Sequence, residues 1–205
     1  PNPLPTQIEG KDLATIVKGL PTGAWTKVLD VNNPNAGETS YTLYDEYYRP
    51  VRTYTSNHLG GFTQVDSKLD WAGKTAYSIT THKYDTNGNV VTVRDNFFYT
   101  AQDRLELHTQ QINGGSAQLI AKNTYDELGQ LTSKNVGGTD ATGNSGLQTV
   151  DYTYNIRGWL KGINDVSNLG TDLFAFRINY NTLDNLGDFD TQGTPLYNGN
   201  IAATY

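Results

Sequence analysis

The sequence predicts an all-β protein built from antiparallel hairpin repeats. Three observations predict it. The composition is rich in β-formers and turn-formers, with 14 Tyr and 21 Gly in 205 residues. A turn motif recurs along the chain, and apolar residues alternate with polar ones on both sides of several turns. Because alternate side chains of a strand point to opposite faces, we expect a sheet with one apolar and one wet face.

The composition also disfavours several classes of function. No segment approaches the ~18 consecutive apolar residues of a spanning helix, so we expect no membrane insertion. Fifteen Lys and Arg against 21 Asp and Glu give a net charge of −6. The basic residues are scattered, which disfavours nucleic-acid binding because phosphate neutralisation needs clustered cations. With no Cys, the chain has no disulfide, no Cys-type zinc site and no thiol nucleophile.

Residues 1–40 are expected to form a less regular lead-in, and residues 41–205 the hairpin array. Some apolar residues between Ile8 and Leu20 have helical spacing, but glycines bound this stretch and Pro21 stops it. A helix is therefore the less favoured interpretation of the lead-in.

An Asp or Asn followed three residues later by Gly recurs through the array. The four full copies are Asp70 to Gly73, Asp85 to Gly88, Asp126 to Gly129, and Asn155 to Gly158. Two degenerate copies begin at Asp45 and Thr100. The residues that precede the six copies are Tyr44, Leu69, Tyr84, Tyr99, Tyr125 and Tyr154. Successive copies begin 25, 15, 15, 26 and 29 residues apart, so the repeat is irregular in length.

This spacing is typical of a hairpin turn. The side-chain oxygen of the first residue can accept hydrogen bonds from backbone N–H groups further round the turn. A Gly three residues later supplies the positive φ of a type I turn with a bulge. We expect the recurring tyrosines to pack between neighbouring hairpins rather than to bind a ligand, and we expect Trp71 and Trp159 to be partly exposed.

Alternation justifies the strands on either side of these turns. Pairs of apolar residues separated by one polar residue occur at Tyr77 and Ile79, Val91 and Val93, and Leu105 and Leu107. The clearest late strand is predicted over residues 173–180. Residues 135–146, with four glycines among polar residues, predict a flexible exposed loop.

Several of these segments resemble a known repeat. YDELGQL from Tyr125, YDTNGNV from Tyr84 and YDEYYR from Tyr44 resemble the tyrosine–aspartate (YD) repeats of bacterial RHS proteins. DWAGK from Asp70, NIRGWL from Asn155 and YNGNI from Tyr197 resemble the version found in large secreted or surface RHS proteins of Gram-negative gliding bacteria. The resemblance covers about residues 41–205.

The resemblance implies a β-sheet that spirals into a hollow shell, secreted or displayed on the cell surface. Such shells enclose a C-terminal toxin or form part of an adhesion protein. Six hairpins are too few to close a shell, so we expect a structural segment of a longer protein. Its expected partners are further repeats of the same polypeptide, an enclosed toxin, or an outer-membrane secretion or surface complex. Two alternatives remain open: a glycan-binding adhesion module, and cargo of a type 9-like export machine.

No enzymatic activity, cofactor or metal site is expected. His58, His82 and His108 lie 24 and 26 residues apart without flanking ligand pairs, so we expect surface histidines rather than metal ligands. The loop from Asp85 lacks the Gly and Glu positions of an EF-hand and is better explained as a turn. The segment Asp184–Asp190 clusters three carboxylates and is a slightly better calcium candidate.

Other catalytic motifs also fail. Gly73-Lys74-Thr75 lacks the preceding Gly of a phosphate-binding loop. Ser116 and Ser145 lie in Gly-rich loops without the elbow of a nucleophilic serine. Some RHS shells end in a self-cleaving segment around an Asp-Pro pair, and this sequence contains no Asp-Pro pair.

Overall fold

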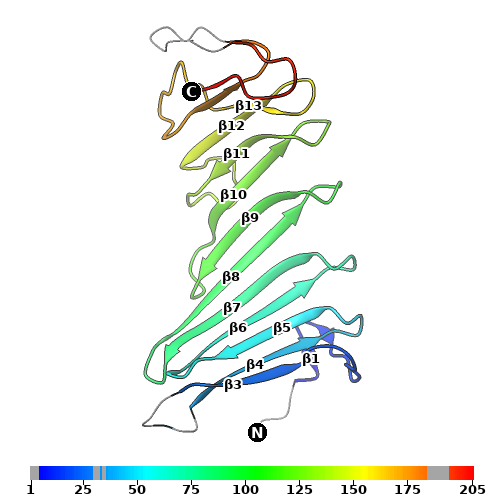
Figure 1. Ribbon diagram of the computed structural model, residues 1–205. Coiled ribbons are helices and arrows are strands. Elements are labelled where there is room, and N and C mark those ends of the chain that lie inside the picture. Colours follow the sequence, from blue (N-terminus) through cyan, green and yellow to red (C-terminus); the bar gives the residue numbers. More distant parts are fainter. Residues whose placement is uncertain (1–4, 30–32, 34–35, 184–193) are drawn as a thin grey trace. The chain divides into compact units, whose positions relative to one another are not determined.

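The computed structural model describes residues 5–29, 33, 36–183 and 194–205. All regular elements in this part of the chain are β-strands, and most consecutive strands pair as antiparallel hairpins (Figure 1). The predicted all-β hairpin class is therefore confirmed. A membrane-spanning helix is not found among these residues. The chain forms two compact units, Pro1–Gln118 and Leu119–Tyr205, which are described separately.

The first unit holds one small hairpin and one antiparallel sheet. The hairpin consists of β1 (Gln7–Ile8) and β2 (Lys11–Asp12), at the start of the stretch whose apolar spacing left a helix as the less favoured interpretation. The strands of the sheet are β3 (Gly23–Lys27), β4 (Gly37–Tyr44), β5 (Pro50–Ser56), β6 (Gly60–Leu69), β7 (Thr75–Asp85), β8 (Val90–Tyr99) and β9 (Leu105–Ile112). Each strand of this sheet pairs with the next one along the chain.

Few side chains of the first unit are buried. Ile8, Val51 and Leu69 form a cluster, and Leu13 packs against it. The lead-in is held in place beside the sheet, since Leu13 bridges to Asp45 and the Ala14 N–H donates to the Tyr44 carbonyl at 2.9 Å. A small hydrophobic cluster therefore lies where the first hairpin meets the sheet.

Pairs of side chains on neighbouring strands stabilise the rest of this sheet. Tyr41, Tyr54 and Phe62 stack across β4, β5 and β6, with ring centroids 4.8 and 5.6 Å apart. Arg52 on β5 holds Asp66 on β6 through two hydrogen bonds of 2.5 and 2.6 Å. Cross-strand pairs of these kinds each contribute about 0.2–1 kcal/mol. Lateral contacts therefore replace much of the burial that a layered protein obtains from a second sheet.

The second unit contains shorter strands. They are β10 (Gln118–Tyr125), β11 (Leu131–Val136), β12 (Gln148–Tyr154), β13 (Leu160–Ile163), β14 (Phe176–Asn179) and β15 (Ala203–Thr204). Each of these strands also pairs with the next.

Two expectations for the second unit are corrected. The strand predicted over residues 173–180 is shorter in the structure, where β14 covers only Phe176–Asn179. Leu173 and Phe174 lie exposed in the loop before it. The loop predicted over residues 135–146 begins later, since β11 extends to Val136. The loop is also hydrogen-bonded internally: the Thr142 and Ser145 N–H groups both donate to the Asp140 carboxylate at 2.9 Å.

Candidate functional site: the repeated turns and their tyrosines

The turn at Asp126 shows how the repeat motif closes a hairpin. The Gly129 N–H donates to the Asp126 carbonyl at 3.0 Å, and the Asp126 N–H donates to the Gln130 carbonyl at 3.0 Å. The Asp126 carboxylate accepts the Gln130 N–H at 2.8 Å. Gly129 has a φ of 85°, a conformation that costs a glycine little. The aspartate and the glycine therefore have the roles expected of them.

Four further turns repeat this geometry. Those at Asp45, Asp70 and Thr100 belong to the first unit, and that at Asn155 to the second. In each, the side-chain oxygen of the first residue accepts the N–H four residues later, at 2.9 to 3.2 Å. The residue three positions after the first has a positive φ, at Tyr48, Gly73, Asp103 and Gly158. The degenerate copies thus keep the turn without its glycine.

The copy at Asp85 differs from the others, which corrects its assignment to the same repeat. Gly88 is not among the residues with positive φ. The Asp85 carboxylate accepts the N–H groups of Asn87 and Gly88 at 2.9 and 2.5 Å. The pairing of β7 with β8 also lacks the register shift that occurs at Tyr44, Leu69 and Tyr99. Asp85 forms a turn, but of another kind.

The Asp85 turn also lies at the other ends of the strands. In a chain of consecutive hairpins, the turns alternate between the two ends of the strands, so every second turn lies on the same side. The turns at Asp45, Asp70 and Thr100 follow β4, β6 and β8 and therefore lie side by side at the same ends of the strands. The Asp85 turn follows β7 and lies at the opposite ends of the strands. Asp85 is therefore out of phase with these three turns. This position does not by itself determine the turn geometry, because the Asn57 turn after β5 lies at the same strand ends and has Gly60 at a φ of 81°.

Among the described residues, two further turns follow the Asp/Asn-to-Gly pattern, although they were not among the predicted copies. Asn57 closes the hairpin between β5 and β6, where its side chain accepts the Leu59 and Gly61 N–H groups at 3.0 and 2.8 Å. Asp140 closes a turn in the loop after β11, and Gly143 there has a φ of 72°. Both have the Asp or Asn and the Gly at the expected spacing, but no tyrosine precedes them. The Asp/Asn-to-Gly spacing alone could have found both.

The repeat tyrosines connect each turn to the preceding strand. Hydroxyl groups of Tyr44, Tyr99 and Tyr154 donate to the carbonyls of Pro21, Thr75 and Leu131, at 2.7, 3.0 and 3.0 Å. Each tyrosine ends one strand, and its acceptor lies at or just before the start of the strand before it. Tyr180, which the motif does not include, makes the same contact with Leu160 at 2.9 Å. We call these contacts tyrosine ties.

The remaining repeat aromatics differ in environment. Tyr84 is 64% exposed, so the expected packing between hairpins is wrong at this position. Tyr125 is half-buried. Leu69, which replaces tyrosine in the Asp70 copy, is buried in the hydrophobic cluster with Ile8.

Burial affects the ionisation of the tied tyrosines. It raises the pKa of Tyr99, and the negative charge of Asp70 acts in the same direction. Burial also raises the pKa of Tyr154. A tie needs a protonated hydroxyl as its donor, so both changes favour the tied form.

Basic side chains connect neighbouring turns in the first unit. The Arg49 side chain pairs with the buried Asp45 carboxylate and also donates to the carbonyls of Asp70 and Trp71, at 3.3 and 3.4 Å. Lys74 pairs with Asp103 and lies 3.5 Å from the Asp70 carboxylate. These links were not expected from the sequence, although a basic residue stands four positions after the first residue of each of these turns.

Hydrogen bonds determine the ionisation of Asp45. Its burial raises the pKa, but hydrogen bonds from the Arg49 side chain and from the Arg49 and Tyr47 N–H groups lower it, and the net direction is downward. The turn therefore favours the charged carboxylate.

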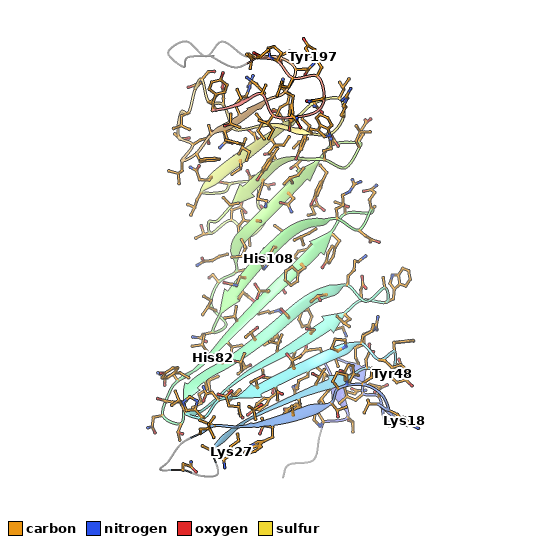
Figure 2. The ribbon with its side chains drawn as sticks, in the orientation of Figure 1. Lys18, Lys27, Tyr48, His82, His108 and Tyr197 are labelled. Carbon is orange, nitrogen blue, oxygen red and sulfur yellow. The ribbon has the colours of Figure 1, made fainter. Side chains whose placement is uncertain are left out.

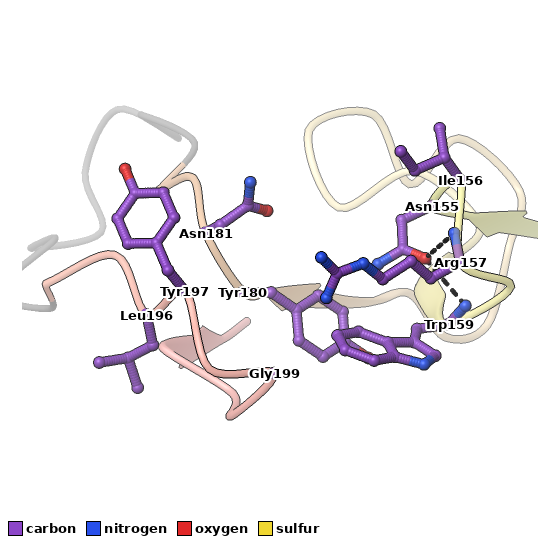
Figure 3. A pocket seen from close by; sticks show the side chains of 9 residues that line it. All are labelled: Asn155, Ile156, Arg157, Trp159, Tyr180, Asn181, Leu196, Tyr197 and Gly199. Atoms are coloured by element: carbon purple, nitrogen blue, oxygen red, sulfur yellow. Dashed lines mark hydrogen bonds between the residues drawn. The ribbon is translucent and has the colours of Figure 1, made fainter.

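A small cavity of about 160 Å³ lies at the Asn155 turn of the second unit. Figure 3 shows three of its lining residues close together, with Trp159 next to Arg157 and Tyr180. The Arg157 guanidinium lies 5.3 Å from the Trp159 ring, and the Tyr180 ring centroid lies at 5.3 Å. Trp159 is half-buried by these contacts, whereas Trp71 is 92% exposed. The cavity is thus a packing site between a turn and the following chain.

Each of the three histidines contacts a partner of its own. His58 lies 3.4 Å from Glu38, His82 lies 2.8 Å from the Thr63 hydroxyl, and His108 lies 2.8 Å from Asp95. His82 and His108 occupy different strands (Figure 2). No group of three His, Asp or Glu residues suited to a metal occurs in the part of the chain that the structure describes. The Asp184–Asp190 candidate lies outside the described residues.

No protein-family model matches this chain, and no curated protein matches it. The interpretation of the site therefore depends on the turns, the tyrosine ties and the strand edges described above.

Proposed function

We propose that this chain is a wall segment of a large secreted or cell-surface protein of the RHS type. In this role it encloses or displays a passenger, such as a toxin, that belongs to the same polypeptide. The role is structural and involves no catalytic step. A wall of hydrogen-bonded strands would keep the passenger from solvent and proteases until its release.

The observation that carries the proposal is the tyrosine tie between consecutive strands. A tie needs only the strand before it, so the same contact can continue along an array of any length. Arrays in which each unit contacts only its neighbours are typical of extended repeat proteins. One turn geometry recurs at the same strand ends of the first unit, at Asp45, Asp70 and Thr100, which supports the same interpretation.

The outer edge of β3 supports further repeats of the same polypeptide as partners. In the described residues, β3 pairs with β4 alone, and all five of its residues are exposed. Trp25, at its centre, is 57% exposed. An exposed strand edge presents unpaired N–H and C=O groups that bind another strand.

Limited proteolysis and electron microscopy of the native full-length protein test the proposal. We expect a large protease-resistant core that contains this segment, seen as a hollow particle. Digestion to small fragments would contradict the proposal, as would a compact particle of about the size of this segment.

A further inference from the structure

A shallow hollow of about 360 Å³ lies on one face of the first unit, over β6, β7 and β8. Its lining residues are Val65, Ser67, Thr75, Ser78, Phe97 and Tyr99. Ligand pockets of proteins commonly have volumes of about 300–1,000 Å³ and combine apolar walls with a few convergent polar groups. The hollow has this size and this mixture of side chains.

Two of the side chains that line the hollow, those of Ser67 and Ser78, carry hydroxyl groups that are free to bind a ligand. Ser67 and Ser78 stand directly opposite each other on β6 and β7, so their side chains share one face. Both residues are half-buried. Neither hydroxyl makes a hydrogen bond within the described part of the chain. A serine hydroxyl can donate one hydrogen bond and accept two, so the pair offers both functions.

A carboxylate fixed by hydrogen bonds stands on the strand next to Ser78, just outside the residues that line the hollow. Asp95 on β8 is the direct partner of Ser78. One of its oxygens accepts the Gln110 side-chain amide at 2.9 Å and lies 2.8 Å from His108 Nε2. Its other oxygen accepts no hydrogen bond from a described residue. Asp95 therefore presents a positioned acceptor whose orientation is already fixed.

An aromatic wall completes the hollow. Phe97 stacks on His108 with ring centroids 4.6 Å apart and an interplanar angle of 25°. Tyr99 is held by its tie to the Thr75 carbonyl at 3.0 Å. Both rings are therefore fixed before any ligand binds, which reduces the entropy lost on binding.

We propose that this hollow binds an uncharged saccharide, one ring of which lies against Phe97 and Tyr99. A pyranose has an apolar C–H face that suits an aromatic wall, and hydroxyls that both donate and accept hydrogen bonds. Ser67 and Ser78 match such hydroxyls, and the Asp95 carboxylate accepts from one of them. The same carboxylate would repel an acidic sugar, in a chain whose net charge is −6.

The test uses the full-length native protein and an array of neutral oligosaccharides with terminal glucose, galactose, mannose or N-acetylglucosamine. We expect binding to at least one of these classes, and the best one is then titrated by calorimetry. Removal of a single hydroxyl by Ser67→Ala or Ser78→Ala should weaken binding about fivefold to tenfold. The double substitution should weaken it further.

Ser40→Ala is the matched control. Ser40 is also a half-buried serine in a strand of the same sheet, but it lies outside the hollow, and its hydroxyl makes no hydrogen bond to a described residue. Circular dichroism shows whether each variant remains folded, and Ser→Ala leaves the strand backbone intact. The proposal is overturned if the folded protein binds none of the sugars, or if folded Ser67→Ala and Ser78→Ala variants bind as tightly as Ser40→Ala. Neither result affects the shell proposal, whose test is the hollow particle.

Discussion

At the scale of single residues, Asp45 joins its own turn to the lead-in, where it bridges to Leu13. Its carboxylate is completely buried, pairs with Arg49 and accepts two backbone N–H groups of its own turn. A buried charge of this kind is stable only with its partners in place. Arg49 extends the connection to the next turn through the Asp70 and Trp71 carbonyls.

We expect Asp45→Ala to lower the free energy of unfolding by about 3 kcal/mol, because it removes one partner of a buried ion pair and two turn hydrogen bonds. Glu46→Ala changes the exposed neighbour in the same turn and is the control, with an expected change of less than about 0.5 kcal/mol. Urea unfolding measures both. Equal losses in the two variants would mean that the carboxylate does not stabilise the turn.

The stabilisation by Asp45 should also depend on pH. Its pKa in the folded protein is below the ordinary value of 3.8. The stabilisation is therefore complete above about pH 3.8 and is lost as pH falls through the lower folded pKa. The stability difference between the wild type and Asp45→Asn should shrink over this acid range. A difference that stays constant there would contradict the direction of the pKa change.

The tyrosine ties give a second prediction at this scale. Tyr99→Phe and Tyr154→Phe remove one hydroxyl each and leave a carbonyl without its donor, so each should destabilise the chain by about 1 kcal/mol. Tyr84→Phe is the matched control, because Tyr84 is exposed and makes no tie, and it should have no measurable effect. Chemical denaturation distinguishes the three variants.

The ties should also weaken at alkaline pH. The pKa values of Tyr99 and Tyr154 are raised above 10.0 in the folded protein. Their stabilisation is therefore complete below about pH 10 and is lost as pH rises through the folded values. Absorbance at the tyrosinate band, followed during alkaline titration, should show fewer late-titrating groups in the two Phe variants.

At the scale of elements, the turn is the unit that the sequence predicts best. A local hydrogen-bonding pattern specifies it, so Asp126, Asn155 and their glycines could be assigned from spacing alone. The tyrosine ties could not be predicted, because their acceptors are backbone carbonyls 23 or 24 residues away and carry no residue signature. The sequence also did not predict that the Asp85 turn lies at the opposite strand ends. The ends at which a turn lies depend on the number of strands between copies, which the motif does not show.

The two turns without glycine allow a prediction about strain. Tyr48 has a φ of 62°, and a side chain in this conformation costs roughly 1–2 kcal/mol. Tyr48→Gly should therefore raise the free energy of unfolding by about 1 kcal/mol after the entropy cost of glycine is included. Tyr47→Gly, one position earlier, removes the ring that lies 5.0 Å from the Arg49 guanidinium and should instead destabilise the chain. Thermal unfolding of the pair gives opposite signs if the strain is real.

At the scale of the whole molecule, the structure contains little hydrophobic core. Five hydrophobic side chains are buried among the described residues, whereas many large ones, including Trp25 and Trp71, are exposed. Stability therefore depends mainly on the hydrogen-bonded ladders and on pairs of neighbouring strands. Chains of this kind are expected to gain stability from additional strands at an open edge.

The isolated 205-residue chain should therefore self-associate through β3. Trp25→Lys places a charge at the centre of this exposed edge strand and should reduce association, as charged residues do on natural sheet edges. Trp71→Lys makes the same chemical change in an exposed turn and should leave association unchanged. Analytical ultracentrifugation over a concentration series measures both, and equal behaviour of the two variants would contradict a role for the edge.

The tyrosine ties also have a consequence for how such an array can change in evolution. Each tie spans one strand and the strand immediately before it, so a duplicated pair of strands brings its own tie and turn and alters no other. Loss of a pair is equally local. Insertion of a single strand, in contrast, would leave the later ties intact but would move every later turn to the opposite ends of the strands, so that links between neighbouring turns such as those of Arg49 and Lys74 could not form across the insertion. Gain and loss of material by whole hairpins is therefore the change in length that this chain tolerates best.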